Sequence, residues 1–180
     1  PVVIKFTATT SGSLYMNSLK LVKTAEFDGE TTDLISTQTG ASIRLNEANG
    51  MRFYAAVDAN LDLSTVDEMG IIIAPKDLVG DYLTMEDTHV KVDYDHINNE
   101  LWSGNQFVGS IASVKDTNLA RDFVARAYVV IDGVTYYAKQ TAVRNIAAIA
   151  DEYMADANGG FDKLDTDTQA LVEKWAKAND

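Results

Sequence analysis

The sequence predicts a mainly β (α+β) fold, with an antiparallel β-sandwich-like core and two C-terminal helices. Residues 122–138, DFVARAYVVIDGVTYYA, alternate apolar and polar side chains around an Asp-Gly pair, which is typical of a tight β-hairpin. Further runs of strand length precede this hairpin, and only after Gln140 do apolar residues recur at helical spacing. Strands first and helices last favour this architecture over alternating β and α units.

The chain before the hairpin supplies the other strands. A short strand is expected within 33–37, and further strands at 42–45, 51–57, 90–94 and 106–114. Met69 to Ala74, MGIIIA, is a continuous apolar run that Pro75 ends, which indicates a strand buried on both faces. We expect the hairpin to lie at the centre of the sheet. Its core-facing residues would be Phe123, Ala125, Ala127 and Val129, with Arg126 and Tyr128 on the other face tying neighbouring strands together.

Two helices should follow the strands. The first is predicted by apolar residues three and four apart and ends at Asn158-Gly159-Gly160; its stripe is Val143, Ile146, Ala147, Ala150, Tyr153 and Met154. The second should run from about Asp167 to Ala178, with Thr166 and Gln169 at capping-box spacing. We expect Trp175 to pin this helix to its own domain.

We expect two segments. Residues 1–38 would form an N-terminal β-hairpin and connection, packed on the main domain or leading into it, and 39–180 would form the β-sandwich-like domain with its helices. The chain opens on a strand-like run from Pro1, so we expect no signal peptide within these residues.

Composition excludes several classes of function. The 15 basic and 27 acidic residues give a formal net charge of −12, which disfavours nucleic acid and anionic membrane surfaces as partners. Apolar runs fall short of the ~18 residues that a membrane-spanning helix needs, so we expect no membrane insertion. There are no cysteines, which excludes disulfides, thiol catalysis and cysteine-ligated zinc.

Aromatic and polar side chains gather between residues 81 and 106. Sugars bind such surfaces because their C–H faces pack on aromatic rings while their hydroxyls bond to Asp and Asn. The candidate ligand-binding residues are Trp102, Tyr94, Tyr82, Asp95, Asn98 and Asn105. The alternative is that Trp102 and Tyr94 anchor loops against the sandwich.

A row of arginines is a second candidate. Arg44, Arg52 and Arg126 would lie together if their strands were neighbours. Such a row could hold a carboxylate, because arginine matches that group in bidentate fashion. The alternative is a structural ladder paired with acidic residues such as Glu68, Asp67 and Asp122.

Catalytic and metal chemistry have weaker support. His96 lies beside Asp93 and Asp95, yet no established catalytic spacing is present, so we expect no enzyme. Two loops offer oxygen ligands for a structural calcium ion, without the glycine and glutamate of a helix-loop-helix site. Their candidate ligands are Asp58, Asn60 and Asp62 in one loop and Asp156, Asn158 and Asp162 in the other.

The N-terminal segment resembles the end of a jelly-roll carbohydrate-binding module. Such modules commonly finish in a pattern like G-x-L-Y-I-D-N-V-x-L-V, and residues 12–22 read GSLYMNSLKLV. Asn17 stands where the pattern has an acidic residue. If the family's structural calcium uses that carboxylate, this chain has lost a charged ligand.

Over residues 40–175 the chain resembles an accessory module of large cell-surface and secreted proteins of gut Firmicutes. The residues that carry the resemblance are ASIRL (41–45), GMRFYAAV (50–57), EMGIIIAPKDL (68–78), FVGSIASVKDTNLARDFVARAYV (107–129) and RNIAAIADEYM (144–154). The resemblance implies a non-catalytic module, secreted or on the cell surface, that accompanies other domains of a multidomain protein. The leading expectation is polysaccharide binding; the alternative is a structural spacer or protein-interaction module without a sugar site.

Overall fold

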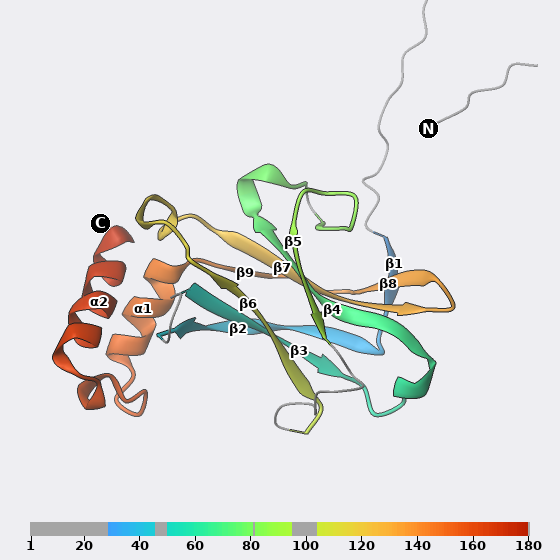
Figure 1. The fold of residues 1–180 in the computed structure, drawn as a ribbon, viewed down its shortest axis with the longest axis horizontal. Helices are drawn as coiled ribbons and strands as arrows, with labels where there is room; N and C mark the ends of the chain where they lie inside the picture. The colour runs from blue at the N-terminus through green and yellow to red at the C-terminus, as the bar shows by residue number, and fades with distance from the viewer. Residues whose placement is uncertain (1–28, 46–49, 81, 95–103, 180) are drawn as a thin grey trace, which may run out of the picture.

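The computed structural model describes residues 29–45, 50–80, 82–94 and 104–179, which form two sheets with two helices at one end (Figure 1). The larger sheet has the order β1 (Glu30–Thr32), β8 (Val134–Ala138), β7 (Phe123–Ile131), β4 (Val66–Pro75) and β5 (Val90–Tyr94), and β9 (Ala142–Arg144) also pairs with β7. The smaller sheet has the order β2 (Ile35–Arg44), β3 (Gly50–Val57) and β6 (Gln106–Ala112). The β1–β8 pair is parallel, and the other pairs of these two sheets are antiparallel. The predicted mainly β, sandwich-like fold with two C-terminal helices is therefore confirmed.

The predicted hairpin is β7–β8, and β7 lies inside the larger sheet between β4 and β8. Asp132 and Gly133 form its turn with φ angles of 52° and 73°, because a tight turn of this kind requires positive φ at both central residues. The core-facing residues of β7 were also predicted correctly. Phe123, Ala125, Ala127 and Val129 are buried in the main hydrophobic core.

The main core lies between the two sheets. Met69, Ile71 and Ile73 of β4 meet the inward-facing side chains of β3 there, among them Met51 and Phe53. Ile72 and Ala74 point to the other face of β4 and join a second, smaller cluster with Leu83, Val124, Tyr128 and Tyr137. The run MGIIIA is thus buried on both faces, as its unbroken apolar character predicts.

The segment after β4 covers part of the outer face of the larger sheet. It includes the short 3-10 helix η2 (Lys76–Leu78), and Leu83 from this segment is completely buried. The backbone amide of Met85 donates a hydrogen bond to the Tyr137 hydroxyl at 2.9 Å. This contact ties the covering segment to β8.

The other 3-10 helices of the described residues are η1 (Leu63–Thr65), η3 (Asp116–Asn118), η4 (Phe161–Lys163) and η5 (Lys177–Asn179).

The helices begin slightly away from their predicted positions. α1 spans Ile146–Ala155 and is capped by the Asn145 side chain, because residues 142–144 pair with β7 as β9 and cannot belong to the helix. α2 spans Thr166–Ala176, and its cap is Asp165, whose carboxylate accepts from two backbone amides of the first turn. The predicted capping position at Thr166 was therefore wrong by one residue. Trp175 is buried in the main core and fixes α2 to the sandwich, as expected.

Strand β2 is longer than predicted, and its pairing in the smaller sheet begins at Ile35, before the expected start of the main domain. It covers most of both predicted strands, with an irregularity in its pairing with β3 between Thr37 and Ala41. The expected segment boundary at 38/39 falls inside this strand, and β1 already pairs with β8 from Glu30 onward. The predicted N-terminal hairpin of residues 1–25 lies outside the described residues.

The condition for a row of three arginines is not met, because Arg126 does not lie on a strand beside the other two. Arg44 and Arg52 lie on β2 and β3 of the smaller sheet, whereas Arg126 lies on β7 of the larger sheet. Neighbouring positions of strands can be inferred from sequence only when the sheet to which each strand belongs is known. Here the strands belong to different sheets.

In the described part of the chain, we find no helix long and apolar enough to cross a membrane.

Candidate functional site

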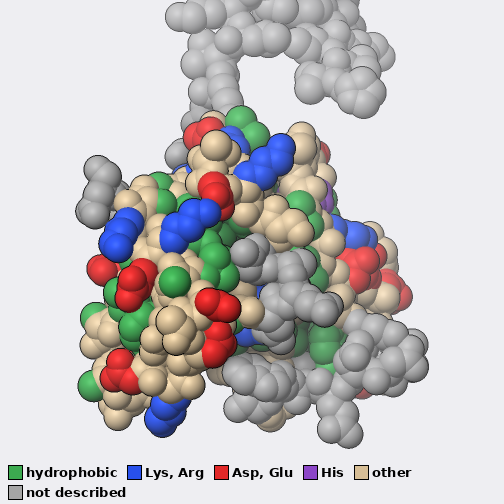
Figure 2. Space-filling view, turned by 60° about the vertical axis from the view of Figure 1, so that its left-hand side comes forward, with side chains coloured by type: hydrophobic (Ala, Val, Ile, Leu, Met, Phe, Trp, Pro, Cys, Tyr) green, Lys and Arg blue, Asp and Glu red, His purple; other side chains and the backbone are tan. Residues whose placement is uncertain are grey.

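A groove lies where α1 meets the smaller sheet. Its volume is about 330 Å³, within the range of small-molecule sites. Its lining residues come from β2 and its C-terminal end, from β3 and from α1; they are Ala41, Ser42, Ile43, Leu45, Arg52, Ile149, Glu152, Tyr153 and Asp156. Figure 2 brings this side of the molecule forward and shows hydrophobic side chains interspersed with acidic and basic ones on the described part of the face.

The strand wall of the groove combines an apolar part with hydroxyl and guanidinium groups. Ser42 and Arg52 are direct partners across the β2–β3 pair. The Ser42 hydroxyl lies 2.7 Å from the Tyr54 hydroxyl, and Arg52 also makes an interaction within the protein. Ala41, Ile43 and Leu45 alternate with Ser42, so the groove is lined from both faces of β2, the edge strand of its sheet. Ser42 and Arg52 are held there by contacts within the protein.

The helical wall is one face of α1. Ile149, Glu152, Tyr153 and Asp156 follow one another at intervals of three, one and three residues, so they lie along one side of the helix. This side is placed by the buried residues of the first half of α1, which pack into the main core. The Tyr153 ring in turn meets the Phe161 ring edge-on, with centroids 6.4 Å apart.

Arg144 holds Glu152 in the groove. Its two terminal nitrogens donate to the two Glu152 oxygens at 3.0 and 3.1 Å, in the forked geometry that carboxylates favour. Arg144 ends β9, so the ion pair also links the larger sheet to α1. The Glu152 side chain remains 55% exposed, which leaves its oxygens able to accept further hydrogen bonds from a ligand.

Asp156 closes the groove at the C-terminal end of α1. Its backbone amide donates to the Glu152 carbonyl, and its Oδ1 accepts from the Asn158 amide at 2.9 Å. The backbone therefore fixes the position of this carboxylate, which is exposed. Its second oxygen, Oδ2, is a hydrogen-bond acceptor at the rim.

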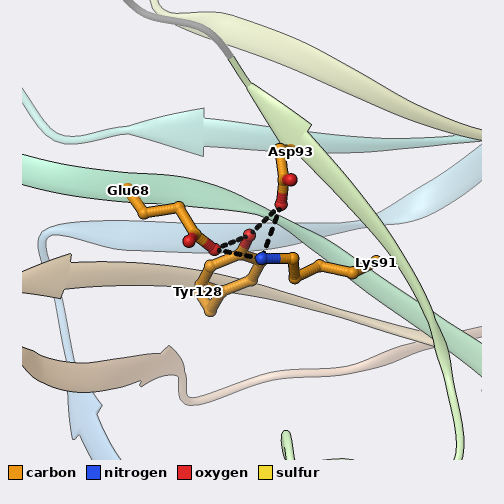
Figure 3. Close-up of polar contacts among 4 residues, drawn as sticks. All are labelled: Glu68, Lys91, Asp93 and Tyr128. Atoms are coloured by element: carbon orange, nitrogen blue, oxygen red, sulfur yellow. Dashed lines mark hydrogen bonds and ion pairs between the residues drawn. The ribbon is translucent and has the colours of Figure 1, made fainter.

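A second polar cluster lies on the outer face of the larger sheet (Figure 3). The Tyr128 hydroxyl lies 2.6 Å from Glu68 Oε1 and 2.7 Å from Asp93 Oδ1, and the Lys91 ammonium lies 2.9 and 3.2 Å from the same two oxygens. Burial, followed by hydrogen bonding to the two carboxylates, raises the pKa of Tyr128 far above its usual range. The hydrogen bond to Glu68 likewise raises the pKa of Lys91. The four side chains satisfy one another, which is typical of a structural network.

Gly70 makes this cluster possible. It lies on β4 between Tyr128 of β7 and Asp93 of β5, its partners on either side. A Cβ atom at this position would lie 2.9 Å from the Tyr128 hydroxyl and 2.3 Å from the Val92 carbonyl oxygen. The tyrosine crosses the sheet over the glycine and thereby reaches the two carboxylates.

Arg126 lies on the same outer face and is completely buried. Its Nε donates to the Ala138 carbonyl at 2.8 Å and its Nη1 to the Leu83 carbonyl at 3.1 Å. The guanidinium lies 4.9 Å from the Tyr137 ring centroid and 5.5 Å from that of Tyr82. These contacts join the covering segment to the sheet, so Arg126 ties parts of the fold together as expected, through carbonyls and aromatic rings.

The predicted aromatic platform is described only in part. Trp102, Asp95 and Asn98 lie outside the described residues. The Tyr94 ring is half-buried and packs on Phe107, with centroids 5.1 Å apart, and Tyr82 is 43% exposed above Arg126.

Asn105, the sixth predicted residue of the platform, has a structural contact. Its side-chain amide donates to the Val57 carbonyl at 2.8 Å. The structure thus places Asn105 in a contact that joins its loop to β3, and Tyr94 in a contact between the two sheets. The platform itself stays a prediction.

The acidic loops have internal partners. Asp58 accepts from Asn60, and Asp62 accepts from the Ser64 amide and hydroxyl, which lowers the pKa of Asp62. In the second loop Asp156 accepts from Asn158. Among the described residues, no group of three or more His, Asp or Glu side chains is placed to hold a metal ion. His89 lies 2.6 Å from the Asp87 carbonyl, and His96 lies outside the described residues.

Sequence reasoning missed the groove. Its two walls are separated by about a hundred residues, and their side chains look ordinary in each strand or helix taken alone. One signal was present. Two carboxylates, Glu152 and Asp156, flank Tyr153 of the apolar stripe near the C-terminal end of the first helix.

Comparisons with known proteins give no relative. No family model matches the chain, no curated protein is similar to it, and no solved structure shares its fold at a significant level.

Proposed function

We propose that this chain is a non-catalytic, extracellular carbohydrate-binding module whose ligand site is the groove between the smaller sheet and α1. The observation that carries the proposal is the lining of the groove. It places hydrogen-bonding groups at Ser42, Arg52, Glu152 and Asp156 around apolar side chains and one tyrosine ring. Saccharides need both elements, because their rings have apolar faces and hydroxyl-rich edges.

Rigid placement of the polar groups supports this proposal. Arg144 fixes Glu152, the Asn158 amide fixes Asp156, and the Tyr54 hydroxyl contacts Ser42. Preorganised groups lose little conformational entropy when a ligand binds, which is important for weakly binding sugars. A groove open to solvent also suits a polysaccharide, whose chain must continue past the site.

The arrangement of Glu152 favours binding over catalysis. Glycosidases need one carboxyl group that delivers a proton and a second that acts as base or nucleophile. Both Glu152 oxygens are engaged by Arg144, which stabilises a charged acceptor. Asp93, which the sequence places near His96, bonds to Tyr128 and Lys91. Incubation of the protein with plant and host polysaccharides should therefore release no reducing ends.

Affinity electrophoresis against plant and host polysaccharides tests the proposal. We expect retardation of the natural chain by at least one glycan. Ala41→Trp, which fills the groove from β2, should abolish it, whereas Thr39→Trp, an equal substitution at an exposed position of the same strand outside the groove, should not. Unretarded migration on every glycan would contradict the proposal, as would equal retardation of both variants.

The alternative is a structural spacer or protein-interaction module of a surface protein. The packing of Tyr94 on Phe107 favours it, because that ring then serves the fold. Exposed Leu78 and Val90, at 61% and 54%, offer apolar surface to a protein partner. Under this alternative, glycans would not retard the chain, and Leu78→Ser would weaken its association with a neighbouring domain of the same protein.

A further inference from the structure

The charges of the groove carry an inference about the class of sugar, which rests on the proposed function. Within the described residues, Arg52 is the one cation that lines the groove, and Glu152 and Asp156 are its two anions. Arg144 balances the charge of Glu152 through their ion pair. Arg52 already makes an interaction within the protein. The Asp156 carboxylate is exposed at the rim and its described contact is to a neutral backbone amide.

An anionic sugar would therefore meet an unfavourable site. A uronate or sulfate needs a cation that can turn to it, and the arginine of the groove is already engaged. Asp156 would repel it at short range. The formal net charge of −12 adds a repulsive field over longer distances.

A neutral sugar meets the opposite situation. Its hydroxyls can donate to Glu152 and Asp156, while its apolar face packs near Ile149 and Tyr153. Because the groove and Arg144 together carry two positive and two negative charges, a ligand without charge needs no counter-ion there. We infer that the groove takes neutral, hydroxyl-rich saccharides and rejects uronic-acid and sulfated ones.

Matched oligosaccharides test this inference. Three β-1,4-linked hexamers, of glucose, of glucuronate and of glucosamine, would be titrated against the natural chain at low salt. The polysaccharides galactan and polygalacturonate, whose linkages differ, would be titrated in the same way. We expect a neutral member to bind at least tenfold more tightly than its anionic counterpart. The gap should narrow at 0.5 M salt, where the Debye length falls to about 4 Å.

A pair of charge variants locates the effect. Asp156→Lys should strengthen binding of the anionic member at least tenfold relative to the natural chain, and Asp151→Lys, the same change at an exposed position of α1 outside the groove, should change it less than threefold. If Asp156→Lys does not fold, Asp156→Asn replaces it, because the new amide oxygen can still accept from the Asn158 amide. Removal of the negative charge should then narrow the difference in affinity between the neutral and the anionic hexamer.

The outcomes separate the two proposals. Binding of the anionic or the cationic hexamer more tightly than the neutral one would overturn this inference and leave sugar binding in place. Equal effects of the two lysine variants would also overturn it, because the net charge alone would then be responsible. Binding of no member of any set would overturn both this inference and the proposed function.

Discussion

The outer face of the larger sheet and the groove beside α1 both collect charged and aromatic side chains, but in different states. On the sheet, Arg126 is completely buried and Tyr128 bonds to two carboxylates that also share Lys91. In the groove, Glu152 and Asp156 are anchored on one side and exposed on the other. Polar groups that satisfy one another hold a fold together, whereas anchored groups that still face solvent can bind a ligand.

The first prediction removes the buried cation. Arg126→Met should lower the free energy of unfolding by about 2–4 kcal/mol, because the buried carbonyls of Ala138 and Leu83 lose their donors at about 1–3 kcal/mol each, partly offset by the easier burial of Met. Urea unfolding measures the loss. Arg121→Met, which removes an arginine that pairs with Asp77 at the surface, should cost about 0–1 kcal/mol. Equal losses of stability for the two arginine variants would show that the buried contacts of Arg126 do not hold the fold together.

The second prediction fills the space over Gly70. Gly70→Ala should destabilise the fold by about 1–3 kcal/mol, the usual range for overpacking, because its Cβ would meet the Val92 carbonyl and displace Tyr128. The same unfolding measurement applies. Gly40→Ala is the control, since a Cβ there meets no atom within 4 Å. A stable Gly70→Ala protein would show that the tyrosine can leave its carboxylates without cost.

The third prediction removes only a hydroxyl. Tyr128→Phe should cost about 1.5–3 kcal/mol at pH 7, at the lower end because Glu68 and Asp93 remain half-exposed and keep Lys91. Tyr136→Phe on β8 should cost less.

The pH dependence of this pair sharpens the test. The pKa of Tyr128 is raised in the folded protein, so its contribution is fully present below the unfolded pKa of about 10. Above that pH the unfolded chain releases the proton and the folded chain keeps it, so stability falls by up to about 1.4 kcal/mol per pH unit. The advantage of the natural chain over Tyr128→Phe should therefore shrink above pH 10. A constant difference between pH 8 and 11 would contradict this.

The smallest effect on stability is expected in the groove. Glu152→Gln weakens an ion pair that is half-exposed and should change the free energy of unfolding by less than about 1 kcal/mol. In affinity electrophoresis, a glycan that retards the natural chain should nevertheless retard this variant less, because one fixed acceptor oxygen becomes a donor. Asp151→Asn, the neighbouring exposed carboxylate outside the groove, should alter neither property. A large stability loss for Glu152→Gln would place the groove with the structural clusters.

Local patterns determined much of the fold. The Asp-Gly turn, the alternation in β7, the unbroken apolar run of β4 and the spacing in α1 each depend on residues close in sequence, which is why the hairpin, its buried face and the helices were predictable. Errors arose where a segment could serve two elements. Residues 142–144 fit the helical stripe but pair with β7.

Only the tertiary structure decided what the polar side chains do. Arg126 and Arg52 occupy similar positions in alternating strands, yet one is buried between two tyrosines and the other lines a groove. The sequence by itself determined most of the strands, the central hairpin and the acidic net charge, but neither β1 nor β9. The choice of sheet for each strand, and hence the groove between β2, β3 and α1, depends on contacts between residues about a hundred positions apart, which no local pattern encodes.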